Sequence, residues 1–239
     1  MSAVAELRSK PADPMIEAVD ATIVARHAVR RFRSEPVPVA MVRDILDVAR
    51  YAPSGTNIQP WRAWVVTGEA RDRLCAASVA ALLATGPRPQ DDEYKYYPDE
   101  FPEANLARRM AFGAAFGAAL GVAHDDMKGR MQAMARQFQF FGAPVGIIFT
   151  MDRALEHGSL LDYGCFLQNI MIAAKARGLD TCAQQSWCQF HSVIRAELGI
   201  PESEMLVCGM SLGWADEAAP ENSLNLGRAP IEDFATFCE

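Results

Sequence analysis

Arginines and small polar side chains are concentrated in two short stretches near the N-terminus. In the first, Arg26 and Arg30 are four residues apart, so they would share one face of any helix that continued through them. A guanidinium binds phosphate through two parallel hydrogen bonds and keeps its charge. The second stretch, 54–59, is a polar loop that precedes Pro60-Trp61 and an apolar run. Fixed charge combined with such a loop predicts a bound phosphorylated cofactor.

Arg228 is a third candidate cation. It stands in an otherwise neutral part of the C-terminal tail, Leu226-Gly227-Arg228-Ala229-Pro230. Taken singly, each of these arginines is better explained as a solvated or ion-paired side chain. Their combination with the 54–59 loop favours the cofactor interpretation.

Other catalytic and binding motifs are either absent or lack the flanking elements that their function needs. Gly209-Met210-Ser211-Leu212-Gly213 matches the Gly-x-Ser-x-Gly nucleophile elbow, but a poor helix follows it and all four histidines precede Ser211, whereas the histidine of the elbow fold follows the serine. The histidines are far apart and the cysteines are not clustered, so no metal site is expected. Neither a dinucleotide-binding glycine motif nor a P-loop is present.

Composition limits the possible partners and compartments. The chain has 239 residues, half of them hydrophobic, and a net charge of −7, which argues against a general nucleic-acid binder. Six cysteines without a Cys-x-x-Cys pair fit buried free thiols in a reducing cytoplasm. No signal peptide is recognised, and the most apolar stretch, 110–123, is shorter than the roughly 20 residues that span a bilayer, so no membrane segment is expected. The spacing of Gly113, Gly117 and Gly121 within it predicts close helix packing.

Hydrophobic periodicity predicts one α+β domain over residues 1–239. Helices are expected at 15–26, 39–51, 69–83, 104–124, 125–138, 158–176 and 190–198, strands at 63–67, 144–150, 178–183 and 205–212, and a short helical segment at 231–237. In the first helix, Ile16, Val19 and Ile23 should face the core. The helix at 158–176 is apolar on most sides, which suits a core or a subunit interface.

The segment 85–102 differs from the rest of the chain in composition. It contains four prolines, five acidic residues and the aromatic residues Tyr94, Tyr96, Tyr97 and Phe101. An exposed loop rarely keeps aromatic side chains without a contact. These side chains are expected to cap a substrate pocket, to contact a partner subunit or to pack back on their own domain, and the sequence leaves all three open.

Several elements, in order from about residue 20 to the end, resemble the FMN-dependent nitroreductase family. They are Arg26-His27-Ala28-Val29-Arg30, the loop at 52–61 (similar to Pro-Ser-x-x-Asn-x-Gln-Pro-Trp), the strand segment 178–185, Leu198-Gly199-Ile200-Pro201 followed by 209–214, and Arg228-Ala229-Pro230. The resemblance implies a nitroreductase-like fold, in which helices flank a central, mostly antiparallel sheet, and an intertwined homodimer with two sites at its interface. It also implies an N-terminal extension (1–19), a variable substrate-facing insertion (85–141) and a C-terminal tail (220–239).

The resemblance further implies roles for individual residues. Arg26 and Arg228 would hold the FMN phosphate, and Arg30 would lie at the pyrimidine edge of the ring, where positive charge stabilises the reduced flavin. The other implied cofactor contacts are the backbone of His27 and Ala28, the loop residues Ser54, Gly55 and Asn57, with Ser54 and Gly55 coming from the second subunit, and Ala183, Gln184 and Gln185 beside the ring. Thr56 is implied on the substrate side, and Tyr97 and Phe138 are candidate contacts for an aromatic substrate. Ala28 replaces the family's usual serine, so flavin binding is expected to be looser.

The predicted activity is that of an FMN-dependent oxidoreductase. NADH or NADPH would pass hydride to flavin N5 and leave, and an electron-poor aromatic, above all a nitro compound, would then take the electrons. Because the flavin carries the chemistry, no catalytic side chain is expected. The alternatives are a quinone or flavin reductase, a dehalogenase or a flavin-destroying enzyme of the same fold, a non-catalytic FMN-binding module, and a dimeric helical scaffold without cofactor. Glu93, Tyr94 and Lys95 lie where dehalogenase members recruit a substrate-gripping lid, although their spacing is not convincing.

Overall fold

A four-stranded antiparallel sheet forms the centre of the computed structural model, which describes residues 13–86, 92–123, 125–224 and 226–238. The strands are β1 (Arg62–Thr67), β2 (Val145–Asp152), β3 (Asp180–Gln184) and β4 (Glu204–Gly213), in the order β1-β2-β4-β3. The two central strands, β2 and β4, are buried over most of their length, as the apolar runs in the sequence predict. The sheet leaves β3 as one of its two edges.

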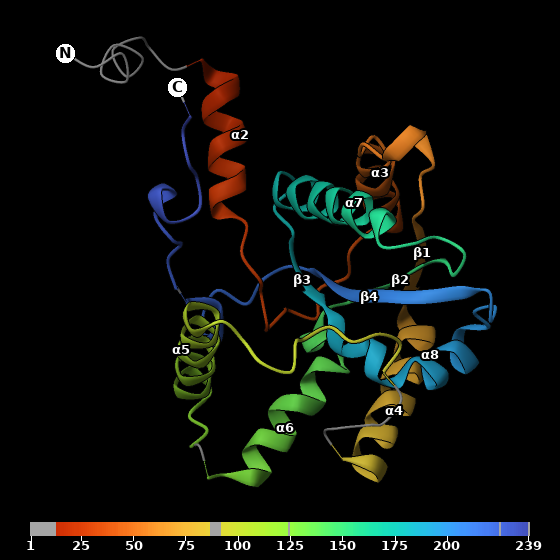
Figure 1. Ribbon diagram of the computed structural model, residues 1–239. Helices are drawn as coiled ribbons and strands as arrows, with labels where there is room; N and C mark the ends of the chain where they lie inside the picture. Colours follow the sequence, from red (N-terminus) through yellow and green to blue (C-terminus); the bar gives the residue numbers. More distant parts are fainter. Residues whose placement is uncertain (1–12, 87–91, 124, 225, 239) are drawn as a thin grey trace.

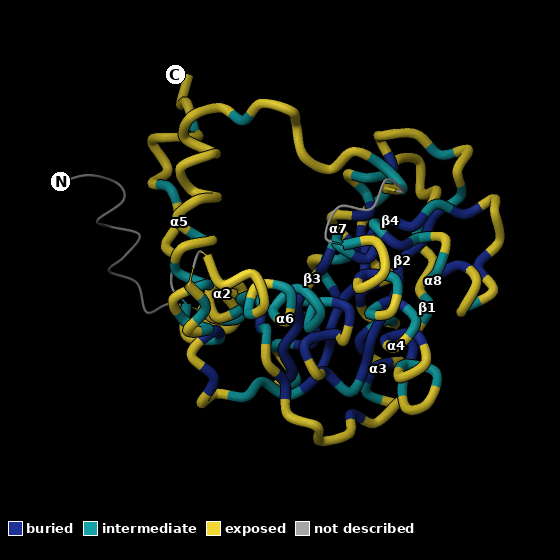
Figure 2. The backbone as a smooth tube through the Cα atoms, turned by 90° about the horizontal axis from the view of Figure 1, so that it is seen from below, coloured by how far each residue is buried: buried dark blue, intermediate teal, exposed yellow. Residues whose placement is uncertain are grey.

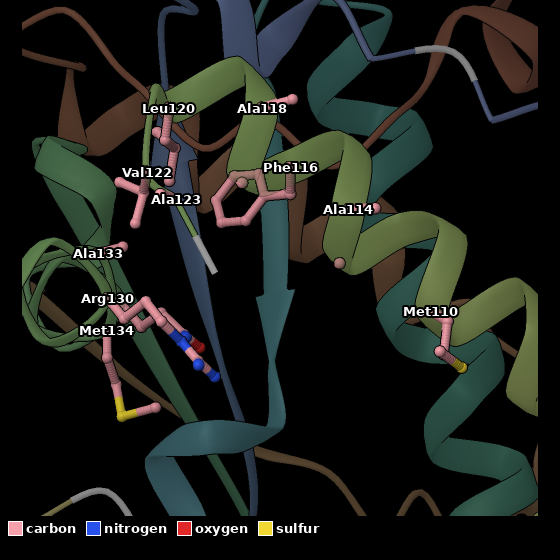
Figure 3. A pocket seen from close by; sticks show the side chains of 13 residues that line it. Met110, Ala114, Phe116, Ala118, Leu120, Val122, Ala123, Arg130, Ala133 and Met134 are labelled. Carbon is pink, nitrogen blue, oxygen red and sulfur yellow. The ribbon is translucent and has the colours of Figure 1, made fainter. Parts of the chain in front are cut away.

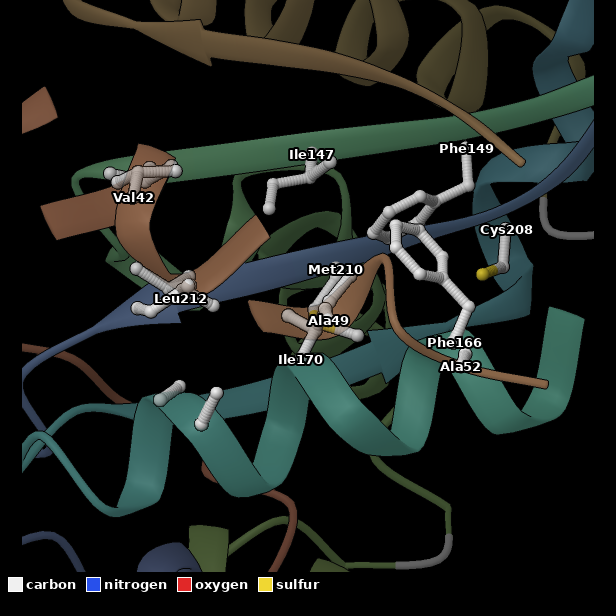
Figure 4. Close-up of a cluster of buried hydrophobic side chains, with 14 of the residues drawn as sticks. Val42, Ala49, Ala52, Ile147, Phe149, Phe166, Ile170, Cys208, Met210 and Leu212 are labelled. Carbon is white, nitrogen blue, oxygen red and sulfur yellow. The ribbon is translucent and has the colours of Figure 1, made fainter. Parts of the chain in front are cut away.

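Helices cover both faces of this sheet (Figure 1). On one face lie α3 (Val39–Ala49) and α7 (Gly158–Lys175), and on the other lie α4 (Gly68–Thr85) and α8 (His191–Leu198). Successive residues of β2 serve opposite faces, because Ile147 packs with the first layer and Ile148 with the second. Figure 4 shows the first layer, in which Phe166 and Ile170 of α7 meet Phe149 and other residues of the sheet.

Three further helices contain no buried residue, although Met131 and Met134 of the third pack against the second layer. They are α2 (Pro14–Ala25), α5 (Glu103–Leu120) and α6 (Met127–Gln137). In Figure 2, α2 and α5 are mostly exposed and lie away from the buried centre. The chain also forms 3-10 turns at Gly55–Asn57, Phe140–Gly142, Gln185–Phe190, Pro220–Asn222 and Ile231–Asp233.

The sequence predicts the position of α2 correctly but its packing wrongly. The helix begins after Asp13, whose side chain accepts a hydrogen bond from the Met15 N–H (2.9 Å), with Pro14 in the first turn. None of its residues is buried: the apolar side chains expected in the core are solvent-exposed, and Ile16 is 58% exposed. An apolar face left exposed among the described residues is typical of an interface.

Other differences are small and local. The helical pattern at 231–237 forms only the 3-10 turn Ile231–Asp233, and the segment before α8 is a 3-10 turn (Gln185–Phe190) that the periodicity did not predict. Of the six free cysteines, Cys165 and Cys238 are exposed rather than buried. No helix in the described part of the chain is both long and apolar enough to cross a bilayer. Nor do the described residues contain a cluster of three or more His, Cys, Asp or Glu that would hold a metal ion.

Candidate functional site

The arginine-rich segment after α2 lies along the free edge of β3. The Val29 N–H donates to the Thr181 carbonyl oxygen (3.1 Å), and Ala28 forms a parallel bridge with Thr181. Val29 is fully buried, whereas Arg26 and Arg30 are half-buried. The interleaved apolar residue thus fixes the segment on the sheet and leaves the two guanidinium groups at its surface.

The turn at Pro220–Asn222 clamps the backbone of this segment. The side-chain oxygen of Asn222 accepts from the N–H groups of Arg30 (2.7 Å) and Arg31 (3.2 Å), while its amide nitrogen donates to the Arg31 carbonyl (2.8 Å). Glu221, only 2% exposed, forms ion pairs with Arg31 and Arg136, each at 2.9 Å. The tail therefore holds the arginine segment and the end of α6 together.

The ion pair between Arg136 and Glu221 keeps the Glu221 carboxylate charged. The Arg136 guanidinium donates to the Arg30 carbonyl (2.7 Å) as well as pairing with Glu221. Burial acts to raise the pKa of Glu221, but hydrogen bonds from its own backbone N–H and from Arg31 and Arg136 outweigh it and lower that pKa below its ordinary value. The carboxylate is therefore charged at neutral pH, as its two partners require.

The Arg30 side chain extends over the aromatic face of α5. Its guanidinium carbon lies 4.8 Å from the ring centre of Phe112 and 5.3 Å from that of Phe116, and the group donates to the Ala28 carbonyl (3.2 Å). Burial raises the pKa of the Cys182 thiol beneath this segment to about 11, and the nearby charges of Arg30 and Arg26 partly oppose that effect. The thiol is protonated at neutral pH and is no candidate nucleophile.

Gln184 joins the sheet to α6. Its side-chain oxygen accepts from the Ser211 hydroxyl (2.6 Å), and its amide nitrogen donates to the Gln137 carbonyl (2.7 Å). Ser211 is fully buried in the middle of β4, which excludes the nucleophile-elbow interpretation. The glycines of that motif serve packing instead, because a Cβ at Gly209 would lie 2.2 Å from the Trp187 ring.

The polar loop at 54–59 has three non-glycine residues in the left-handed backbone region. Thr56, Asn57 and Gln59 all have positive φ angles (46°, 63° and 48°), which residues with a side chain seldom adopt. The loop is held by hydrogen bonds from the Gly55 N–H to Asp162 (3.2 Å) and from the Gln59 N–H to the Ser54 hydroxyl (3.0 Å). Residues 55–59 are exposed, so a strained loop is presented on the surface.

Within one chain the loop and the arginine segment lie at opposite ends of α7. The loop is bonded to Asp162 in the first turns of that helix, whereas Thr181, which carries the arginine segment, follows the end of the helix at Lys175. At a rise of about 1.5 Å per residue, these helix positions are about 20 Å apart. The structure therefore brings together Arg26, Arg30 and β3, but not the 54–59 loop.

A cavity of about 560 Å³ opens between α5 and α6 (Figure 3). Its walls are mostly small or apolar: Met110, Gly113, Ala114, Phe116, Gly117, Ala118, Leu120, Val122, Ala123, Arg130, Ala133, Met134 and Gln137. Phe116 is also beneath Arg30, and the Gln137 carbonyl is bonded to Gln184, so the cavity adjoins both features. Gly113 lines the cavity, and a Cβ there would meet none of the described residues within 4 Å, so the predicted close packing at this glycine is not found among them.

The aromatic segment before α5 divides into an anchored and an exposed part. The Tyr94 hydroxyl donates to the Val207 carbonyl (2.6 Å), and the buried Glu93 carboxylate pairs with Arg153, His191 and Arg195. These two side chains point into the domain, so they do not form a substrate-gripping set with Lys95, which pairs with Asp99 (2.5 Å).

Tyr96 and Tyr97 form the exposed part of this segment. The Tyr97 ring packs against Phe101 and lies 4.6 Å from the guanidinium carbon of Arg109 on α5. Residues 87–91 of this segment lie outside the described part of the chain.

Comparison with known proteins identifies the family. Residues 23–214 match the Nitroreductase family. The chain belongs to the nitroreductase family. Curated relatives include a nitrobenzene nitroreductase of Ectopseudomonas oleovorans (49% identity) and a chloronitrobenzene nitroreductase of Comamonas testosteroni (48%), each aligned over 95% of this chain and 98% of the relative. Among solved structures, the FMN-dependent nitroreductase NfnB of Mycobacterium smegmatis in complex with NADPH has a TM-score of 0.89 at 32% identity and covers 94% of this chain and 100% of its own.

The nitroreductase fold predicted from the sequence is thereby confirmed. One residue that the sequence predicts at the site, Phe138, lies elsewhere. Phe138 is 0% exposed and packs edge-to-face against Trp187 and Phe190 in the core. The aromatic side chains after α6 therefore pack in the core and do not line a substrate pocket. Arg228 is exposed and donates to the Gly227 carbonyl (2.6 Å), so its contact with a phosphate stays a prediction.

Sequence reasoning also missed residues that build the site. Asn222, Glu221 and Arg136 hold the arginine segment, yet they are single polar residues without a recognisable spacing. Ser211 matches a nucleophile motif, but a serine in an apolar strand also predicts a buried hydrogen-bond partner, and it serves as one for Gln184.

Proposed function

We propose that this nitroreductase-family chain is an FMN-dependent NAD(P)H oxidoreductase that reduces nitroaromatic compounds. The observation that carries the proposal is the attachment of the Arg26–Arg30 segment to the edge of β3, which gathers two fixed positive charges beside an open strand end. The comparisons support it, because the curated relatives are nitrobenzene and chloronitrobenzene nitroreductases and the NfnB structure is described as FMN-dependent and in complex with NADPH.

The residues present suit a flavin mononucleotide. Arg26 and Arg228 would bind its phosphate, the backbone of His27 and Ala28 would line the ribityl chain and the ring, and Arg30 would lie at the pyrimidine edge. Ala183 is exposed on the edge strand β3, and together with Gln184 and Gln185 it would pass the ring. When bound, FMN would accept hydride from NADH or NADPH at N5 and then reduce the acceptor in a ping-pong reaction.

The protein's own contribution is positioning and electrostatics. Arg30 is held by the Asn222 clamp and by the Phe112–Phe116 surface, so its charge is fixed before the cofactor is reduced. The cavity between α5 and α6 offers apolar walls for an aromatic acceptor, and Tyr97 and Thr56 are proposed to contact it. No nucleophile or strong acid is required of the chain.

The separation along α7 favours a homodimer. Ser54, Gly55 and Asn57 would reach the flavin only from a second subunit, and the exposed apolar residues of α2 and α7, such as Ile23 and Leu161 (77% exposed), provide surface for one. A second copy would thus complete each site with its strained loop.

The visible spectrum tests the proposal directly. Purified protein reconstituted with FMN is expected to show flavin bands that bleach on anaerobic addition of NADPH or NADH and return on addition of nitrobenzene. Return with a quinone but not with nitrobenzene would indicate a quinone reductase, and flavin that NAD(P)H does not bleach would indicate a binding module. Protein that takes up no FMN would contradict the cofactor assignment.

A further inference from the structure

The guanidinium group of Arg30 lies against a pair of aromatic rings that α5 supplies. Its central carbon is 4.8 Å from the ring centre of Phe112 and 5.3 Å from that of Phe116. The two rings are one helical turn apart, their centres are 5.6 Å apart, and their planes are within 10° of parallel, so they form one aromatic surface. Because the face of an aromatic ring attracts a cation, this surface favours one position of a long and otherwise mobile side chain.

The backbone of Arg30 is fixed independently of these rings. Its N–H donates to Asn222 (2.7 Å), and its carbonyl oxygen accepts from Arg136 (2.7 Å). The guanidinium itself has one hydrogen bond among the described residues, which it donates to the Ala28 carbonyl (3.2 Å). The clamp therefore determines where the side chain begins, whereas the rings of α5 determine where its charge ends.

The charge held in this way acts on the edge strand of the sheet. Burial raises the pKa of the Cys182 thiol in β3 to about 11, and the charges of Arg30 and Arg26 act against that rise. The next residue of β3, Ala183, is exposed at the edge where the flavin ring is proposed to lie. The position of the Arg30 guanidinium thus bears directly on the electrostatic potential at the proposed cofactor site.

We propose that Phe112 and Phe116 are positioning residues that set the reduction potential of the bound flavin by holding the Arg30 guanidinium at its pyrimidine edge. The inference rests on the proposed function, since it concerns the FMN of the same site. Reduction adds negative charge to that edge, and a positive charge already fixed there stabilises it more than a mobile, hydrated one does. The rings act through Arg30 and not by contact with the flavin.

The midpoint potential of the bound FMN tests the inference without any acceptor present. It is measured against reference dyes during anaerobic reduction with dithionite. The double variant Phe112→Leu, Phe116→Leu keeps apolar side chains without a ring, and because α5 has no buried residue the core stays intact. We expect the preference for reduced over oxidised FMN to fall about tenfold, which lowers the potential of a two-electron couple by about 30 mV.

Two matched variants separate the rings from other effects of substitution. Phe112→Tyr combined with Phe116→Tyr keeps both ring faces and should retain the parental potential. Phe101→Leu removes a ring that lies at the same distance, 4.8 Å, from a different guanidinium, that of Arg109, and should also leave the potential unchanged.

A double-mutant cycle with Arg30→Met decides whether the rings act through the arginine. Arg30→Met should lower the potential, and the two leucine substitutions should lower it no further in that background. An equal shift with and without Arg30 would overturn the inference, as would an unchanged potential in the double leucine variant. A raised potential would also overturn it, because the rings would then hold the guanidinium away from the flavin.

The wild-type protein keeps the inference and the proposed function apart. Flavin that NADPH or NADH reduces and nitrobenzene reoxidises, with a potential that the leucine substitutions do not lower, contradicts the role of the rings and leaves the proposed function standing. Bound flavin that dithionite reduces but neither nucleotide does contradicts the proposed function, while the potentials still decide the role of the rings. Protein that binds no FMN contradicts both.

Discussion

Single polar side chains hold the candidate site together at the residue scale. Asn222 uses both its oxygen and its nitrogen on the backbone of residues 30 and 31, and Glu221 neutralises two arginines at once. A buried carboxylate between two guanidinium groups is satisfied only while all three remain in place. Arg31 and Arg136 are thereby committed to the clamp, so Arg26 and Arg30 remain as the arginines of this region whose charges are available to a cofactor.

Replacing Arg228 tests the phosphate assignment. Arg228→Ala is expected to weaken FMN retention by about 10- to 100-fold, because a charge-assisted hydrogen bond contributes about 1.5–3 kcal/mol. The dissociation constant is measured by fluorescence titration of the apoprotein with FMN. Arg43→Ala, which removes an exposed cation from α3, is the matched control. If Arg228→Ala binds FMN as tightly as the parent protein does, Arg228 does not hold the phosphate.

The lowered pKa of Glu221 predicts how stability depends on pH. A carboxyl group whose pKa is lower in the folded than in the unfolded protein contributes stability that is complete above the unfolded value, ordinarily about 4.5, and is lost as the pH falls through the folded value. Glu221→Gln should therefore be less stable than the parent at pH 7, and the difference in Tm should shrink as the pH is lowered below about 4.5. A constant difference between pH 7 and pH 3 would show that the charge of Glu221 is not what stabilises the clamp.

At the element scale, α5 and α6 decide what the sheet-based core can bind. They carry the cavity, and both are joined to the site. Phe112 and Phe116 of α5 lie beneath Arg30, whereas α6 is connected through Arg136, which bonds Arg30 and Glu221, and through Gln137, whose carbonyl is bonded to Gln184. The segment before α5 is anchored by Glu93 and Tyr94, so its exposed rings start from a fixed base.

The exposed ring of Tyr97 tests this view of the aromatic segment. Tyr97→Ala removes the contact with Arg109 on α5 and is expected to change kcat/KM among aromatic acceptors by roughly 3- to 10-fold, since such ring contacts contribute about 1 kcal/mol. The rate of flavin reduction by NAD(P)H, measured separately by stopped flow, should change less. Tyr97→Phe keeps the ring and should behave as the parent. Equal losses in both half-reactions would point to impaired folding rather than to acceptor selection.

The elements were predictable where one chain supplies their environment. The buried strands β2 and β4 appear in the sequence as apolar runs, α7 as a helix that is apolar on most sides and α3 as a helix with one apolar face, because each packs in the core of its own chain. The packing of α2 was mispredicted because its apolar side chains stay exposed in the described part of the chain, and periodicity does not say what covers an apolar face. The prediction that Phe138 contacts the substrate was wrong for a related reason, since composition does not distinguish a ring in the core from one in a pocket.

At the scale of the whole molecule, one chain keeps the arginine segment and the 54–59 loop apart. The arginine segment and the end of β3 are assembled, while the strained 54–59 loop faces outward at the other end of α7. A strained exposed loop persists only if the surrounding structure holds it, and Asp162 and Ser54 do so here. In the homodimer that we propose, two copies related by a twofold axis would bring each loop to the other chain's arginines.

Subunit mixing tests whether one site takes residues from two chains. Arg26→Glu replaces a positive charge by a negative one and so opposes phosphate binding. Gly55→Val adds a side chain to the loop where it would approach the flavin. Its own chain should tolerate that side chain, because a Cβ at Gly55 would meet only Asp162, at 3.9 Å. Each variant homodimer is expected to bind FMN poorly. A heterodimer purified through two different tags should regain roughly one of its two sites, because both defects then fall in the same site and the other is intact. If Arg26 and Gly55 instead served the same site from one chain, every site of the heterodimer would carry one defect and no flavin would be regained. A species that light scattering shows to be monomeric but that binds FMN fully would contradict the shared site outright.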